Sequence, residues 1–198
     1  VITKDPELSY RLRLIRNHGE AMVFDSDPPE RIKAALGYNF RLPEMLAAMG
    51  YAQTGKIDFL NDIRRKNYET LKEGLDPLPF IDFQKITNDI GGFFPYCVGL
   101  TFNSEKFGIE RNLFAQALRA EGIPVSTGFP RLLSENPLYK QNSDTPIARE
   151  LNYEKYLGFF QIGYPNNNGD MKDIIDAFEK LSINRKNLQS AKDTIEII

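Results

Sequence analysis

The sequence has very few of the residues that cross-link a fold or bind a metal ion. It contains no tryptophan, one cysteine (Cys97) and one histidine (His18) among 198 residues. One cysteine cannot form an intrachain disulfide, and a structural zinc site needs about four cysteine or histidine ligands. We therefore predict neither a disulfide nor a metal site, and this low cysteine content is typical of a reducing, cytoplasmic compartment.

The chain also lacks an excess of charge of one sign and any long apolar run. It has 25 Lys and Arg against 27 Asp and Glu, a net charge of -2. This balance offers no basic surface for nucleic acid or for an anionic membrane. No apolar run approaches the roughly 20 residues that cross a bilayer, and the first residues lack the features of a signal peptide. We expect a soluble, cytoplasmic protein without nucleic-acid or membrane partners.

Apolar residues, in contrast, are plentiful: they make up 41% of the chain, enough for a sizeable core. Helix-start signals and apolar spacing predict a first helix over residues 6–18, followed by an irregular loop over residues 20–36. A second helical stripe over residues 42–75 indicates one long helix or two nearly joined. Gly50 and Gly55 predict a kink or close backbone packing there, because glycine costs about 1 kcal/mol in a helix interior.

The second half alternates between strand and helix patterns. Strands are expected at residues 80–83, 96–102, 124–129 and 159–162, and helices at residues 109–118, 147–156 and 170–181. We expect Gly122 to end the first of these helices in the left-handed conformation, and Asp170 to cap the last. This order predicts an α/β fold with a mixed or antiparallel sheet. We place a domain boundary between residues 1–76 and 77–198, where prolines follow the long helix.

The sequence carries no glycine-rich phosphate loop of the dinucleotide-binding or P-loop type. His18, as the only histidine, would have to serve any nucleophilic machinery that needs an imidazole base. It lies at the end of the predicted first helix, however, between Asn17 and Gly19, and a histidine cation near a helix C-terminus is the more common arrangement. Arg131, two residues after Phe129, is placed either at a strand end or in an exposed surface loop.

Residues 37–41, Gly-Tyr-Asn-Phe-Arg, place the amide of Asn39 and the guanidinium of Arg41 just before a predicted helix start. Such a group can bind an anion, because free amides at a helix start and a guanidinium both favour negative charge. Alternatively, Asn39 caps the helix and Arg41 pairs with Glu44 or another carboxylate. Spacing alone favours this second interpretation.

Two stretches carry a resemblance to a known family. Residues 12–19 read LRLIRNHG, and residues 37–53 read GYNFRLPEMLAAMGYAQ. Together with the β-branched residues 1–3 before an acidic helix start, and AEGIPV at residues 120–125, they resemble the DegT-type (DegT/DnrJ/StrS) sugar aminotransferases. Members of that family use pyridoxal 5'-phosphate on the fold type I scaffold. The resemblance spans residues 1 to about 181 and is most specific in residues 37–53.

The resemblance implies that this chain is the C-terminal part of such an enzyme. Residues 1–76 would be the edge of the cofactor domain and a long interdomain helix, and residues 77–198 a small α/β domain with a mixed or antiparallel sheet. The lysine that forms the Schiff base in the family lies upstream of the position of Val1, so no residue of this chain is assigned that role. We therefore expect the chain alone to be catalytically inactive.

The resemblance also implies roles for individual residues. Asn39 matches the family's asparagine that reaches across a homodimer to the phosphate of the neighbouring subunit's cofactor, which reverses the preference for a plain helix cap. Arg41 follows in the same motif, as a residue of that site or of the substrate's anion site. His18, Phe129 and Arg131 match regions that line the active-site entrance. Relatives often carry a tyrosine where Phe129 stands, and Phe129 has no hydroxyl to contact the sugar.

The implied activity is transfer of an amino group from glutamate or glutamine to a keto sugar nucleotide, for the amino sugars of surface polysaccharides or natural products. The implied partners are a second copy of the chain, the nucleotide sugar and the amino donor. Two alternatives stay open. One is a sugar dehydratase of the same family, in which histidine replaces the Schiff-base lysine, and the other is a non-enzymatic dimerisation or sugar-nucleotide-binding module.

Overall fold

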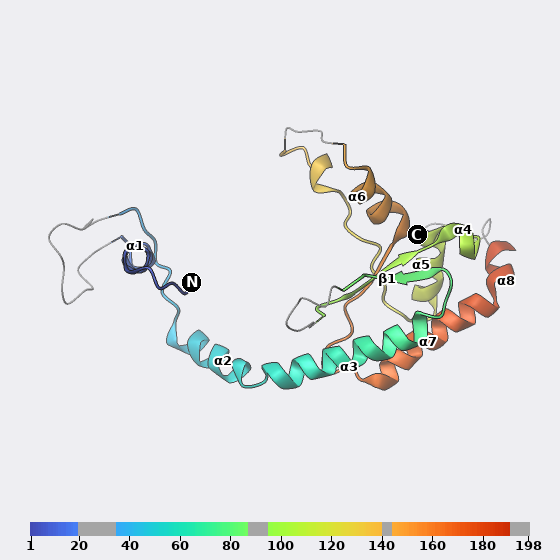
Figure 1. The fold of residues 1–198 in the computed structure, drawn as a ribbon, viewed down its shortest axis with the longest axis horizontal. Coiled ribbons are helices and arrows are strands. Elements are labelled where there is room, and N and C mark those ends of the chain that lie inside the picture. Colours follow the sequence, from blue (N-terminus) through green and yellow to red (C-terminus); the bar gives the residue numbers. More distant parts are fainter. Residues whose placement is uncertain (20–34, 87–94, 140–143, 191–198) are drawn as a thin grey trace. The chain divides into compact units, whose positions relative to one another are not determined.

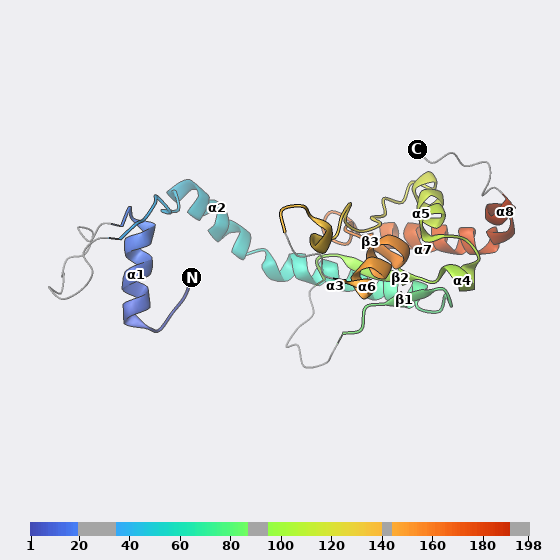
Figure 2. The same ribbon diagram turned by 90° about the horizontal axis from the view of Figure 1, so that it is seen from above.

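The computed structural model describes residues 1–19, 35–86, 95–139 and 144–190. The chain divides into two compact units, Val1–Lys56 and Ile57–Ile198, and each is described by itself. Figures 1 and 2 show the helices and strands of both units. Most of the loop expected at residues 20–36 lies outside the described residues.

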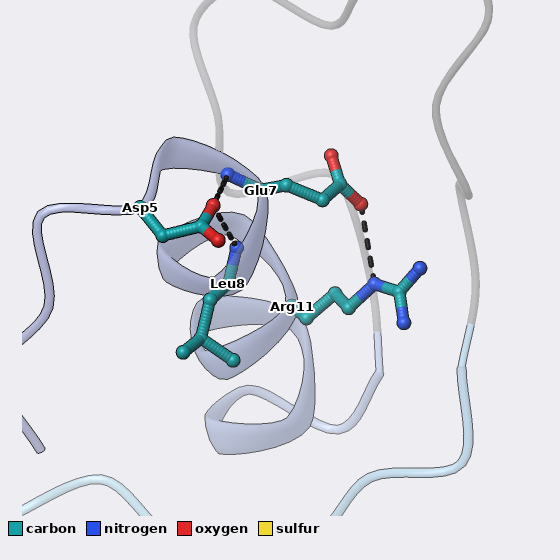
Figure 3. A network of polar contacts seen from close by, with 4 residues as sticks. All are labelled: Asp5, Glu7, Leu8 and Arg11. Carbon is teal, nitrogen blue, oxygen red and sulfur yellow. Dashed lines mark hydrogen bonds and ion pairs between the residues drawn. The ribbon is translucent and has the colours of Figure 1, made fainter.

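The first unit begins with helix α1, Pro6–Arg16, which confirms the helix expected at its start. Asp5 caps it, because its Oδ1 accepts the amide N–H groups of Glu7 at 2.8 Å and Leu8 at 3.1 Å (Figure 3). An ion pair joins Glu7 to Arg11 one turn later, on the exposed side of the helix. The helix ends two residues earlier than the sequence predicted.

The helical stripe expected over residues 42–75 forms two helices, α2 (Glu44–Thr54) and α3 (Ile57–Leu75). The break lies at Gly55, the C-cap of α2, whereas Gly50 lies inside α2 with open space beside its Cα. No residue of α2 is buried. The compact units divide between these two helices, and the boundary predicted after residue 76 concerns the domains of a parent enzyme and stays a prediction.

A three-stranded antiparallel sheet lies in the second unit, in the order β1 (Ile81–Phe83), β2 (Val98–Phe102) and β3 (Tyr156–Phe159). Ile81 pairs with Phe102, and Val98 pairs with Phe159. The alternating burial of β2 shows that one face of the sheet is turned to the core. This sheet confirms the predicted α/β fold and its antiparallel alternative.

Two strand predictions were wrong in place or extent. The strand expected at residues 159–162 lies at Tyr156–Phe159, because pairing with β2 ends at Phe159, and Ile162 is buried outside the sheet. The strand expected at residues 124–129 is reduced to a single bridge between Ser126 and Gly158. Gly128 has a φ of +104°, which turns the chain out of the extended conformation.

Packed phenylalanine rings join the sheet to its helices. The helices of this unit beyond α3 are α4 (Ser104–Phe107), α5 (Arg111–Ala120), α6 (Pro146–Glu150), α7 (Asn168–Ile183) and α8 (Arg185–Ser190). Phe114 of α5 is fully buried and stacks on Phe102 of β2, with 4.6 Å between ring centroids. Its ring also meets that of Phe178 of α7 at 5.3 Å. Helix α3 lies alongside α7 (Figures 1 and 2), so both helices close the same core.

The ends of α5 and α7 follow known capping chemistry. Gly122, just beyond α5, has a φ of +86°, which confirms the predicted left-handed cap. The N-cap of α7 is Asn167 rather than the predicted Asp170. Asn167 Oδ1 accepts the Gly169 N–H at 2.8 Å, and Asp170 Oδ2 accepts the Asn167 N–H at 2.8 Å, which completes a capping box. Asp170 therefore acts from inside the helix, three residues beyond the cap.

Residues 128–155, of which the structure describes 128–139 and 144–155, are here called the excursion. They follow the bridge at Ser126 and precede β3. They include a 3-10 turn (Leu133–Glu135), α6 and a π-helical turn (Leu151–Lys155). The helix expected at residues 147–156 is this α6 with the π-helical turn that follows it. Figure 1 shows α6 standing away from the sheet.

Replacing Phe114 by alanine is expected to lower the free energy of unfolding by about 3–5 kcal/mol, because it opens a cavity among packed rings. The matched control is Ile183→Ala at a site that is 83% exposed, which should change that free energy by less than about 0.5 kcal/mol. Because the chain has no tryptophan, urea unfolding is followed by far-UV circular dichroism. A loss below about 1 kcal/mol for Phe114→Ala would contradict this packing.

Candidate functional site

The candidate site of the first unit forms where α1 ends and residues 35–41 run back along it. The backbone amide of His18 donates to the carbonyl of Tyr38 at 3.1 Å. Asn17 and Asn39 form an isolated antiparallel bridge. The two stretches that carried the family resemblance are thus held against each other by backbone hydrogen bonds.

Two glycines permit this close approach. Gly19 has a φ of +77°, and a Cβ added to it would lie 1.6 Å from the carbonyl oxygen of Ala35. A Cβ added to Gly37 would lie 2.4 Å from the amide nitrogen of Gly19. Both clashes are with backbone atoms, so no side-chain movement relieves them. Only glycine fits at either position without moving the backbone.

Arg41 contacts the end of α1. Its Nη1 donates to Oδ1 of Asn17 at 2.5 Å, and its Nη2 lies 3.4 Å from Nε2 of His18. Because a guanidinium only donates, Nε2 of His18 accepts in this contact, and we assign the ring proton to Nδ1. The structure thus brings Arg41 and His18 together. It also adds Asn17, which is 5% exposed and which the sequence analysis treated only as part of a helix end.

Asn39 is exposed beside this group. Its Oδ1 accepts the backbone N–H of Arg41 at 3.3 Å, and among the described residues its Nδ2 has no acceptor. Asn39 does not cap α2, because α2 has Pro43 at its N-cap and no side-chain cap. Arg41 contacts the end of α1 rather than Glu44. The arrangement offers an amide donor and a positive charge, which suit an anion such as a phosphate.

The other two predicted site residues, Phe129 and Arg131, lie in the excursion of the second unit. Both side chains are exposed, that of Phe129 by 79%. The backbone of Phe129 is held by the buried Asn152: Oδ1 of Asn152 accepts its N–H, and Nδ2 donates to its carbonyl, both at 2.8 Å. This two-bonded amide contact joins the two ends of the excursion. Sequence patterns did not single out Asn152, because its partner lies 23 residues away.

A second polar group ties the excursion together farther from the sheet. Tyr153 donates its hydroxyl hydrogen to Oε2 of Glu135, and Arg149 forms an ion pair with Oε1 of Glu135 at 2.6 Å. The hydrogen bond from Tyr153, followed by the charge of Arg149, lowers the pKa of the Glu135 carboxyl. The same bond raises the pKa of the Tyr153 hydroxyl. Glu135 is therefore the carboxylate that links the 3-10 turn to α6.

A family model described as the DegT/DnrJ/EryC1/StrS aminotransferase family matches residues 1–157. The chain belongs to this family. The match includes both stretches of the first unit described above and the whole of the excursion. The resemblance found in residues 12–19 and 37–53 is therefore confirmed.

Two curated relatives show the range of the family. GDP-4-keto-6-deoxy-D-mannose 3-dehydratase of Yersinia pseudotuberculosis is 30% identical over 190 residues, which cover 88% of this chain and 47% of that protein. L-glutamine:2-deoxy-scyllo-inosose aminotransferase of Streptomyces kanamyceticus is 25% identical over 204 residues, which cover 91% of this chain and 48% of that protein. The chain thus spans about half the length of the curated relatives it matches.

The fold is also shared with solved structures. S. venezuelae DesV superposes with a TM-score of 0.71 at 24% identity, over 91% of this chain and 46% of that chain. This likeness confirms the predicted fold: the chain has the fold of the matched part of that structure. Among the residues that the structure describes, no three His, Cys, Asp or Glu side chains gather as a metal site. Within the same residues, no helix has the length and apolarity to cross a membrane.

Replacing Gly19 by alanine is expected to release residues 37–41 from the end of α1, because the added Cβ meets the carbonyl of Ala35. The measurement is amide hydrogen exchange, and the His18 N–H, now bonded to Tyr38, should lose at least about tenfold of its protection. The control Gly50→Ala has nothing within 4 Å of its Cβ and should leave this protection unchanged. Unaltered protection of His18 in Gly19→Ala would show that the close approach does not exist.

Replacing Tyr153 by phenylalanine is expected to raise the pKa of Glu135 toward its ordinary value, because the strongest hydrogen bond to the carboxylate is removed. The lowered pKa means that this link stabilises the excursion above the ordinary carboxyl pKa of about 4.3, and that the stabilisation is lost as the pH falls through the lowered value. A carbon-13 NMR titration of the Glu135 carboxyl measures the change. Tyr139→Phe, at an exposed tyrosine, is the control and should leave the Glu135 titration unaltered.

Proposed function

We propose that the full-length protein to which this chain belongs is a pyridoxal-phosphate-dependent sugar aminotransferase. It transfers an amino group from glutamate or glutamine to a keto sugar nucleotide in amino-sugar biosynthesis, in the cytoplasm. The observation that carries the proposal is the family match over residues 1–157, which covers the donor group at Asn39 and Arg41. The aminotransferase from Streptomyces kanamyceticus supports the same reaction class.

The donor group suits the phosphate of the cofactor. A phosphate is best held by N–H donors and positive charge. Asn39 offers an amide donor, and its Oδ1 accepts the backbone N–H of Arg41, two residues later. In the proposal, Asn39 Nδ2 donates to the phosphate, and Arg41, held by Asn17, adds a positive charge beside it or beside the substrate's phosphates. Bound pyridoxal phosphate supplies the electron sink for amino-group transfer.

We further propose that the enzyme is a homodimer, in which Asn39 serves the cofactor of the neighbouring subunit. The support is helix α2, which follows this segment. Its apolar side chains Met45, Leu46 and Met49 are exposed by 81%, 53% and 63%. Methionine and other apolar residues are enriched where obligate subunits meet. In the assembled enzyme this face of α2 would be covered.

Substrate binding is proposed for His18, Phe129 and Arg131. His18 faces Arg41 and can donate through Nδ1, whereas Arg131 brings an exposed positive charge suited to a nucleotide diphosphate. Phe129 offers its ring for stacking but no hydroxyl. The Schiff-base lysine is proposed to lie upstream of the position of Val1, so the chain alone would be inactive.

A second function is favoured by one observation. The dehydratase from Yersinia pseudotuberculosis is 30% identical to this chain, which keeps the dehydratase alternative open. The two activities would differ at the position of the Schiff-base residue, lysine in an aminotransferase and histidine in a dehydratase. The third alternative is a non-enzymatic module, without a cofactor, that serves dimerisation or sugar-nucleotide binding.

The deciding experiment is borohydride reduction of the full-length protein after incubation with pyridoxal phosphate, followed by intact-mass and peptide analysis. A pyridoxyl adduct on a lysine upstream of the position of Val1 supports the aminotransferase. Reversible binding without an adduct supports the dehydratase, and no binding leaves the module. Turnover of an amino donor by the purified chain 1–198 alone would overturn the assignment of the lysine to an upstream segment.

Within the same protein, Asn39→Ala is expected to weaken binding of pyridoxal phosphate roughly 10- to 100-fold, because a hydrogen bond to a charged group is worth about 1.5–3 kcal/mol. Fluorescence titration of the cofactor measures the dissociation constant. Asn112→Ala, at an exposed asparagine of α5, is the matched control and should leave it unchanged. Equal affinity in Asn39→Ala and the unmodified protein would remove Asn39 from the phosphate site.

A further inference from the structure

A buried guanidinium lies at the base of the excursion. Arg111, the first residue of α5, is 4% exposed. Among the described residues it has no carboxylate partner, and burial lowers the pKa of its guanidinium. Arginine nevertheless stays charged in proteins, so this is a buried positive charge. Such a charge is tolerated only where hydrogen bonds replace its water.

Backbone carbonyls supply those hydrogen bonds. Nη1 of Arg111 donates to the carbonyls of Thr127 at 2.5 Å and Tyr156 at 2.7 Å. Nη2 donates to the carbonyls of Asn152 at 3.2 Å and Tyr153 at 2.5 Å. Four of the five N–H groups of the guanidinium are used. The fifth, at Nε, is buried and has no acceptor among the described residues.

These four carbonyls come from the two ends of the excursion. Thr127 precedes its first residue, and Asn152, Tyr153 and Tyr156 lie at its return to β3. One planar group therefore joins segments that are at least 25 residues apart in the chain. The four contacts therefore make Arg111 a link between two segments, unlike a residue that only caps a helix or forms one surface ion pair.

Asn152 extends the contact from Arg111 to the segment that carries the predicted substrate residues. Its carbonyl accepts from Arg111, and its side-chain amide both donates to and accepts from the backbone of Phe129. Gly128 makes room for this amide, because a Cβ there would lie 2.4 Å from Oδ1 of Asn152. The path runs from Arg111 through Asn152 to Phe129, two residues before Arg131.

We propose that Arg111 is the positioning residue of the excursion: acting through Asn152, it holds Phe129 and Arg131 where they meet the nucleotide-sugar substrate. The inference rests on the proposed function in one respect, the contact of Phe129 and Arg131 with substrate. Arg111 itself touches no substrate, since its side chain is buried.

The test uses the full-length enzyme with Arg111→Met, Asn152→Ala and both together. Amide hydrogen exchange of Phe129 reports the position of the segment, and should speed up at least about tenfold in each variant. Steady-state kinetics with glutamate and GDP-4-keto-6-deoxy-D-mannose report whether this segment contributes to substrate binding. KM for the sugar nucleotide should rise roughly 10- to 100-fold while kcat stays within about threefold. The double variant should add little to either single change, since both residues act along one path.

Arg119→Met is the matched control. Arg119 lies on the same helix and donates through Nε and Nη2 to one carbonyl, that of Val125, outside the excursion. This variant should leave the exchange of Phe129 and the KM unchanged. Asn152→Ala tests the second step of the path separately, because it removes the side-chain amide that holds Phe129 and keeps the carbonyl that accepts from Arg111.

Three results would overturn the proposal. They are unaltered exchange of the Phe129 amide in Asn152→Ala, a rise of KM in Arg119→Met equal to that in Arg111→Met, and faster exchange in Arg111→Met or Asn152→Ala with an unaltered KM. Failure of the proposed function would be recognised by a different result, namely no turnover by the unmodified protein. In that case the exchange of Phe129 decides the positioning role by itself.

Discussion

The second unit depends on a buried positive charge, that of Arg111, which has no carboxylate partner among the described residues. Four backbone carbonyls replace the water that the Arg111 guanidinium loses on burial. These carbonyls belong to the segments just before the excursion and at its end, so the guanidinium holds the two segments together. The first residue of α5, the start of β3 and the π-helical turn are therefore fixed at one point. The phenylalanine core around Phe114 sets the distance between helix and sheet, and the guanidinium sets where the excursion leaves them.

The first unit depends on a different constraint, the absence of side chains at Gly19 and Gly37. Without a Cβ at either position, the backbone after α1 and the backbone before α2 approach closely enough to bond. That approach brings Arg41 to Asn17 and leaves Asn39 exposed with a donor in use by no described residue. In this motif the two glycines first allow the backbone segments to approach, and that approach then positions the polar side chains of Asn39 and Arg41. Both belong to the stretches that identify the family.

Local features were predictable from the sequence, and long-range pairings were not. The caps at Asp5 and Gly122 and the stripes of α1, α3 and α7 depend on neighbours within a few residues, which a sequence pattern contains. The place of β3 depends on its pairing with β2, far away in the chain, and the pattern put that strand three residues too late. Asn39 and Arg41 were found through the family motif, because their spacing alone fits a helix start equally well. Arg111 and Asn152 were missed, because a buried polar residue on a helix face looks like any exposed one until its carbonyl partners are placed.

The bridge between Ser126 and Gly158 has a consequence for how the molecule behaves at high concentration. A sheet of three strands exposes two edges, and an open edge invites a strand from another molecule. Here the N–H of Gly158 donates to the carbonyl of Ser126, and the N–H of Ser126 donates to the carbonyl of Gly158, both at 2.8 Å. The outer side of β3 is thus occupied at its centre by a short piece of the same chain. An added strand would therefore find the N–H and carbonyl of Gly158 already bonded on that side.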